Sequence, residues 1–302
     1  AADQKNTEEF EMTVINTNVG ATITQNALSK NDRLMGQAME RLSTGKRINS
    51  ASDDAAGLAI SSRMTAQIKG LDQAARNAND AIAMIQTADG ASIEVANMLQ
   101  RMRELAIQSI TETNTATDRD NLGVEFIALQ AEIARISSTT QWNGENILDG
   151  SAGTDTDGVV VYQVGANSGQ TISIDLGDWA TDGTGVYSNG GSTNDISSES
   201  TGISLSTSTA AASALAKIDT AINGINTQRA TYGAVMNRLE YVVDNLANVS
   251  QNAEASRSRV EDANYAQETT ELARTQIIQQ AGTAMLAQAN QSAQAVLQLL
   301  KG

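Results

Sequence analysis

A narrow apolar stripe that continues over long stretches constrains this chain most. From residue 60, apolar or small residues recur at mixed steps of three and four: Ile60, Met64, Ile68, Leu71, Ala75, Ala78, Ile82 and Ile85. This spacing is typical of one face of a long helix that packs along a heptad-like seam. The chain contains no proline, so nothing interrupts such a helix. A helix of about 50 residues would be roughly 75 Å long, so we expect a rod-shaped protein or one that assembles.

Two further helical stretches and one irregular stretch complete the pattern. The same spacing returns in residues 215–249, and a helix with Phe126 and Ile133 on one face is expected after a polar turn, capped at Thr117 and Asp118. Between the helical halves, residues 158–164 and 170–176 are rich in β-branched residues and flank the sequence GANSG, which predicts a β-hairpin. The expected fold is mainly α, a long antiparallel helical hairpin or coiled-coil bundle with a small β-hairpin region near the tip.

Composition excludes several kinds of chemistry. The 302 residues include no histidine and no cysteine, so a histidine triad, a thiol nucleophile, a Cys/His zinc site and disulfides are excluded. Aromatic residues make up only 3% of the chain, which favours closely packed helices over a β-sandwich. The spaced pair Asp155 and Asp157 lacks the other ligands of a calcium loop, so a solvated loop is expected there. We therefore expect no enzyme activity, no metal and no cofactor.

Charge and hydropathy exclude two classes of partner. The net charge of -15 argues against binding to nucleic acid and to anionic membranes, because both need a basic face. No stretch has the apolar length of a membrane span. Residues 1–11 are acidic and polar, without the basic and apolar regions of a secretory signal. The sequence predicts a protein of the cytosol or one exported by a route that ignores signal peptides.

Six blocks of sequence, in order along the chain, resemble bacterial flagellin. They are VINTN at 14–18, RLSTGKRINSASDDAAGLAISSRM at 41–64, LQRMRELAIQ at 99–108, TTQWNGENILDG at 139–150, VGANSGQTISIDL at 164–176, and the C-terminal block at 256–300. The resemblance implies a subunit that is exported unfolded through the flagellar type III apparatus and polymerises with itself into a hollow extracellular helical filament used for swimming. Implied partners are an export chaperone at the C-terminal arm, the filament cap and the hook–filament junction proteins.

The resemblance also implies a division into domains. In flagellins the terminal helices form the inner tube, called D0, and the longer helices with the hairpin form the outer tube, called D1. The expected division is a flexible extension at 1–11, D0 at 12–53 and 262–302, D1 at 54–176 and 206–261, and a variable surface loop at 177–205. Large outer domains are not expected.

Two sets of site residues follow from the resemblance. Arg101, Leu105 and Glu125 match positions at which flagellins contact the Toll-like receptor that senses them, although Arg101 and Glu125 could instead serve subunit packing. The residues expected to pack in D0, against each other and against neighbouring copies, are Val14, Ile15, Leu28, Leu34, Leu42, Leu272, Ile277, Ile278, Leu286, Val296, Leu297, Leu299 and Leu300.

Two alternative functions remain open at the level of sequence. A hook–filament junction protein shares the helical ends, although the blocks at 99–108 and 282–291 favour flagellin. A surface-displayed adhesive flagellin homologue could bind glycans through residues 150–205, where Tyr162, Trp179 and Tyr187 are the only aromatic residues. The serines and threonines of residues 187–209 could also carry O-linked glycans.

Overall fold

The computed structural model describes residues 18–153, 158–179 and 205–301, with side chains up to residue 291. Contacts divide the chain into two units, residues 1–65 with 255–302 and residues 66–254. These divisions fall inside two long helices, whereas the sequence places domain boundaries in the turns at 53/54 and 261/262. The two units are described separately below.

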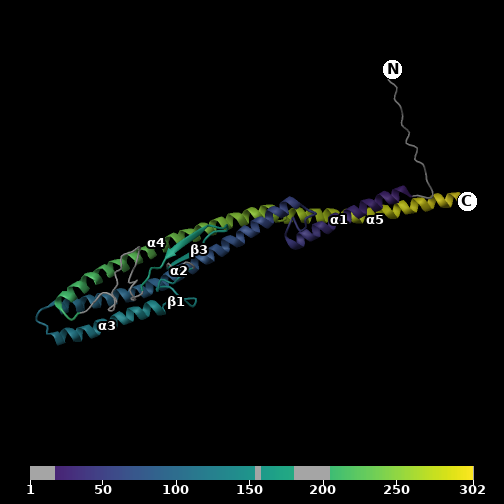
Figure 1. Cartoon of the computed structure of the whole chain (residues 1–302). Coiled ribbons are helices and arrows are strands. Elements are labelled where there is room, and N and C mark those ends of the chain that lie inside the picture. Colours follow the sequence, from purple (N-terminus) through teal and green to yellow (C-terminus); the bar gives the residue numbers. More distant parts are fainter. Residues whose placement is uncertain (1–17, 154–157, 180–204, 302) are drawn as a thin grey trace, which may run out of the picture. The chain divides into compact units, whose positions relative to one another are not determined.

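Five helices and four short strands make up the described residues (Figure 1). They are α1 (Val19–Thr44), α2 (Ala55–Ile110), α3 (Ala116–Thr139), β1 (Gln141–Trp142), β2 (Glu145–Asn146), β3 (Val159–Gln163), β4 (Thr171–Asp175), α4 (Ser208–Glu261) and α5 (Tyr265–Lys301). The predicted fold class, mainly α with a small antiparallel β region, is confirmed. No helix in the described ranges has the length and apolarity to cross a membrane.

In the first unit, α1 and α5 lie side by side and antiparallel (Figure 1). Asn18 accepts a hydrogen bond from the Ala21 amide and so caps the start of α1. The same Asn18 donates to the carbonyl of Ala289 on α5, and Arg41 near the other end of α1 pairs with Glu268. These contacts fix the antiparallel direction of the pair.

In the second unit, α2 and α4 share one continuous apolar core with α3 and β4. The predicted seam of α2 is right for Ile68, Leu71, Ala78 and Ile85, which are buried, but wrong for Ile60, which is 37% exposed. The seam is also broader than predicted, because Ala81 and Ala88 face the core, and Ala74 packs with Leu71 and Leu246 in a second small cluster. Alanines let the helices approach closely, which explains how a core with few aromatic residues is filled.

The predicted cap of α3 is wrong by two residues. Thr115, not Thr117, is the N-cap, and its hydroxyl accepts from the amide of Asp118. The Asp118 carboxylate accepts in return from the Thr115 amide at 3.0 Å, which completes a capping box. The Thr115 hydroxyl also donates to the Asp118 carboxylate at 2.7 Å, and this bond, followed by the bond from the Thr115 amide, lowers the pKa of Asp118. The T-x-x-D spacing was the signal in the sequence.

Two small antiparallel hairpins accompany the helices. Strands β3 and β4 pair from Val159–Asp175 to Gln163–Thr171, as the sequence predicts. Strands β1 and β2 have two residues each and are joined by Asn143 and Gly144, both with positive φ (51° and 86°). Positive φ at both central residues is the geometry of a type I′ hairpin turn, which Asn-Gly favours.

Trp179 corrects the prediction for the variable segment. The sequence predicts a surface loop at 177–205, but Trp179 is only 1% exposed and belongs to the core. Its indole nitrogen donates to the carbonyl of Leu176 at 2.9 Å, and its amide donates to the carbonyl of Leu148. Leu205 is also buried. Residues 180–204, including Tyr187, and the pair Asp155 and Asp157 lie outside the described residues.

Candidate functional site

The segment that joins α1 to α2 and the segment that joins α4 to α5 meet within the first unit. Both lie in sequence blocks that resemble flagellin. We call this site the junction, and it consists of residues 45–54, Gly57, Ser61 and residues 260–264. Its backbone is paired across the chain, because the Arg47 amide donates to the carbonyl of Glu261 at 2.7 Å and the Ala263 amide donates to the carbonyl of Gly45 at 2.9 Å. Gly45 has φ +71°, the left-handed conformation that ends a helix most readily at glycine.

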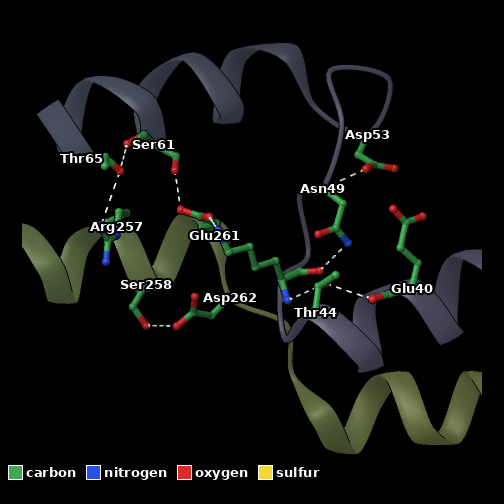
Figure 2. Close-up of polar contacts among 11 residues, drawn as sticks. Glu40, Thr44, Asn49, Asp53, Ser61, Thr65, Arg257, Ser258, Glu261 and Asp262 are labelled. Carbon is green, nitrogen blue, oxygen red and sulfur yellow. Dashed lines mark hydrogen bonds and ion pairs between the residues drawn. The ribbon is translucent and has the colours of Figure 1, made fainter.

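Glu261 is the polar centre of the junction (Figure 2). Its carboxylate forms an ion pair with Lys46 and accepts a hydrogen bond from the Ser61 hydroxyl, while its side chain is only 14% exposed. Both partners stabilise the charged form, first Lys46 and then Ser61, and they lower the pKa of Glu261. Arg47 adds a bond from its guanidinium to the carbonyl of Val260 at 2.7 Å.

The turn before α2 is held by a second carboxylate. Asp53 accepts hydrogen bonds from the backbone amides of Ser50 and Asn49, and the Gln37 side chain on α1 donates to it at 3.0 Å. The backbone bonds to Ser50 and Asn49 are the main cause of the lowered pKa of Asp53. The turn is therefore tied to both helices that it joins.

Gly57 lies where neighbouring side chains pack closely against the start of α2. The Asp54 carboxylate accepts from the Gly57 amide at 2.9 Å, as an N-cap does at the start of a helix. A Cβ at position 57 would lie 2.5 Å from Cδ1 of Ile48, which is buried. It would also lie 2.5 Å from the Asp54 carboxylate, so a glycine at position 57 lets both Ile48 and Asp54 pack against the start of α2.

The residues predicted to pack in D0 fall into three groups. Leu28, Leu42, Leu272 and Leu286 are partly buried on α1 and α5. Leu34, Ile277 and Ile278 are exposed, with Ile277 at 66%. Val14 and Ile15 lie outside the described residues, and the structure does not describe the side chains of Val296, Leu297, Leu299 and Leu300. In a single chain, therefore, α1 and α5 leave several large apolar residues uncovered.

The buried contact between α1 and α5 is largely polar, whereas the sequence predicts that apolar residues pack there. Asn31 and Thr275 are both buried, and the Asn31 amide donates to the carbonyl of Thr275 at 2.8 Å. Gln279 donates to Asp32 across the same contact. A Cβ at Gly282 would lie 3.1 Å from the side chain of Leu28, so this glycine allows a close approach of the helices. Polar residues at positions predicted to face the partner helix could have indicated this polar contact.

The predicted receptor-binding residues lie in the second unit but differ in accessibility. Arg101 on α2 donates to Glu125 on α3 at 2.8 Å and to Glu104 at 2.9 Å, and these carboxylates raise its pKa, Glu125 most. Arg101 and Glu125 are about half exposed. Leu105 is 2% exposed and belongs to the core. A partner can reach Arg101 and Glu125 in this conformation but not Leu105.

The described residues offer little to a small ligand. Among them, no group of three or more acidic residues has the arrangement of a metal site. A polar pocket of about 380 Å³ lies beside the β1–β2 turn, lined by Gln141, Gly144, Glu145, Asn146, Ser151 and Gly153. Of the aromatic residues considered for glycan binding, Trp179 is buried, and the Tyr162 hydroxyl contacts Sδ of Met84 at 3.2 Å. Trp179 therefore offers no ring face to a sugar, whereas Tyr162 is partly buried and lines a pocket of about 200 Å³ together with Trp142.

Comparisons with known proteins agree with this architecture. The sequence model of the bacterial flagellin N-terminal helical region matches residues 15–153, and that of the bacterial flagellin C-terminal helical region matches residues 215–300. Flagellin of Halalkalibacterium halodurans is 47% identical over 291 residues, which cover 95% of this chain and all of the relative. Flagellin of Bacillus subtilis is 43% identical over 303 residues, 95% of this chain and 99% of the relative.

A third relative extends the comparison to another group of bacteria. Flagellin FlaB1 of Treponema pallidum is 39% identical over 293 residues, which cover 95% of this chain and all of the relative. Alignments of this length span whole relatives, so these proteins are about as long as this chain, as expected for flagellins without large outer domains. The chain therefore belongs to the bacterial flagellin family and is a structural subunit of the extracellular flagellar filament.

Proposed function

We propose that α1 and α5 together form the assembly arm, the part of the subunit that packs against other copies in the filament. The observation that carries this proposal is the apolar surface of the pair. Large apolar side chains are exposed on both helices: Val19, Ile23, Leu34 and Met39 on α1, and Ile277, Ile278 and Met285 on α5. Their number on one helix pair indicates a surface that a partner covers, and further copies of this chain supply the same apolar chemistry.

The arm also suits a subunit that is exported unfolded through the flagellar type III apparatus. Two helices that bury mainly polar and small residues against each other gain little from packing in isolation. Folding of the arm would then be completed by binding to neighbouring subunits. The chain contains no cysteine, so no disulfide opposes threading through a channel.

The implied partners act at the same arm and at the ends of the filament. An export chaperone would cover the apolar C-terminal residues of α5 before assembly, because an exposed apolar helix is otherwise prone to aggregate. The cap and the hook–filament junction proteins would contact the first and last subunits. A chaperone complex that protects residues 265–301 from proteolysis supports this proposal, and unchanged cleavage there contradicts it.

Recognition by the innate-immune flagellin receptor is proposed for Arg101 and Glu125. Both side chains are accessible and oppositely charged, and they lie on neighbouring helices. Leu105 would contribute by holding α2 in the core rather than by contact. A receptor reporter assay with Arg101→Ala and Glu125→Ala tests this, and unchanged signalling from both variants contradicts it.

Expression in a motile bacterium that lacks its own flagellin tests filament formation. The proposal predicts that the full chain restores long filaments and swimming. A parallel strain that expresses the chain without residues 1–11 measures what that segment does to assembly. Secreted chain without filaments, or short assemblies that end at the hook, would favour the junction-protein alternative instead.

A further inference from the structure

We propose that Asn143 is a site of spontaneous deamidation, a covalent modification that turns this residue into aspartate or isoaspartate. Asn143 and Gly144 form the two-residue turn between β1 and β2, and both residues are exposed. Glycine lacks a side chain, so it leaves the backbone nitrogen after Asn143 open to reaction.

The reaction needs only water. The backbone nitrogen of Gly144 loses its proton and attacks the side-chain carbonyl carbon Cγ of Asn143, so that a new C–N bond forms. The bond from Cγ to the side-chain nitrogen Nδ2 breaks, and this nitrogen takes up the proton and leaves as ammonia. The resulting succinimide ring then adds water at one of its two carbonyls and opens. One opening gives aspartate, and the other gives isoaspartate, in which the chain continues through the former side chain.

The β1–β2 turn can reach the reactive geometry at low cost. The Gly144 nitrogen must turn toward the Asn143 side chain, which requires the hairpin to open briefly. Two residue pairs, Gln141–Asn146 and Trp142–Glu145, join the strands. Just beyond them, the Ile147 amide donates to the carbonyl of Thr140 at 3.1 Å. A two-stranded hairpin of this size is marginally stable by itself, so local opening is frequent.

A second Asn-Gly pair in the same chain provides an internal control. Asn223 is also exposed, but Asn223 and Gly224 lie well inside the 54-residue helix α4. There the backbone is held by helical hydrogen bonds, and reaching the reactive geometry requires that part of α4 to unfold. The two sites therefore share chemistry and exposure and differ in backbone order. A third pair, Asn189 and Gly190, lies outside the described residues.

Deamidation would change the local structure in two ways. Aspartate at position 143 adds a negative charge two residues from the exposed carboxylate of Glu145. Isoaspartate adds a methylene to the backbone of a turn that has two residues, and this disrupts the pairing of Trp142 with Glu145. Trp142 packs against the apolar core, so the change extends beyond the turn. In an extracellular filament, the modified fraction would increase with the age of the subunit.

Peptide mass spectrometry of the purified full chain, incubated at neutral and mildly alkaline pH, tests the proposal. The expected result is at least about tenfold faster deamidation at Asn143 than at Asn223, which corresponds to roughly 1.4 kcal/mol of additional opening free energy in the helix. The same chain in denaturant should react at similar rates at both sites. Asn143→Gln should remove the modification at that peptide without changing Asn223.

Two results would overturn the proposal. One is a deamidation rate at Asn143 in the folded chain that is less than about tenfold higher than the rate at Asn223. The ordered helix would then not protect Asn223 by the additional opening free energy that the proposal requires. The other is a ratio that stays high in denaturant, since it would then come from the neighbouring sequence and not from the fold. An isoaspartate-specific methyltransferase reads out the second product independently and should label the peptide that contains residue 143.

Discussion

Ser61 of α2 donates a hydrogen bond to the Glu261 carboxylate of α4, two hundred residues further along the chain. This contact and the Lys46–Glu261 ion pair place the residues of two distant flagellin-like blocks in one junction. The blocks at 41–64 and 256–300 are therefore explained by structure: their polar residues hold the turns before α2 and α5 together.

Glu261→Ala should loosen the junction. The change leaves the Ser61 hydroxyl and Lys46 without their shared acceptor, at a cost of about 1–2 kcal/mol because Lys46 is half exposed and its pairing is screened. The measurement is hydrogen exchange at the Arg47 and Ala263 amides, which donate across the junction. Exchange there should become about 5- to 30-fold faster. Asp262→Asn is the matched control at the next position, because the Asp262 side chain is exposed and accepts a hydrogen bond from Ser258 in the last turns of α4.

The same amides should respond to pH. The pKa of Glu261 is lower in the folded state than its ordinary value of 4.5, so the unfolded state binds the proton more readily. The stabilisation is thus complete above that value and is lost as pH falls through the lowered pKa. Exchange corrected for intrinsic rates should accelerate on acidification in the wild-type chain. Glu261→Gln should show a weaker dependence, and an identical dependence would contradict the role given to this carboxylate.

Gly57→Ala should destabilise the first unit by about 1–3 kcal/mol, because the new Cβ would overlap Cδ1 of the buried Ile48. Gly36→Ala in α1 is the control, since a Cβ there meets nothing within 4 Å. That change should stabilise the helix by up to about 1 kcal/mol. Urea unfolding followed by hydrogen exchange in each unit measures both. Equal effects of the two substitutions would show that the junction is not closely packed.

Leu105→Ala and Arg101→Ala should separate packing from recognition. Leu105 lies in the core, so its truncation should cost about 2–5 kcal/mol of unfolding free energy. Arg101→Ala removes an exposed side chain and should leave the unfolding transition unchanged while receptor signalling falls. Parallel unfolding and reporter assays measure the two effects. If Leu105→Ala lost receptor signalling while the chain remained fully folded, Leu105 would have to contact the receptor directly.

Asn31→Leu should weaken the register between α1 and α5. A buried polar residue in a helical interface specifies one alignment, because a shifted alignment leaves it unpaired. The cysteine-free chain allows a direct readout with introduced cysteine pairs. Asp32→Cys with Gln279→Cys reports the observed register, and Asp32→Cys with Thr283→Cys reports a shift of one turn. The shifted pair should cross-link within one chain only when Asn31→Leu is present.

Sequence reasoning predicted the elements that depend on local patterns. The 3/4 spacing predicted α2, and alternating β-branched residues around GANSG predicted β3 and β4. It failed where a distant partner decides. Trp179 was placed in a polar loop because its neighbours are polar, yet Leu148 and Leu176 hold it in the core. The burial of Leu105 and the polar contact of Asn31 with Thr275 likewise depend on the facing helix.

Electron microscopy of the purified chain after addition of salt or filament seeds tests most directly whether the exposed apolar residues of α1 and α5 drive assembly. Ile277→Asp should leave a folded chain, because Ile277 is 66% exposed, but it should not form tubes. Gln276→Asp adds the same charge beside it and should assemble like the wild-type chain. Long tubes from the wild type and Gln276→Asp alone would agree with the account, and normal tubes from Ile277→Asp would contradict it.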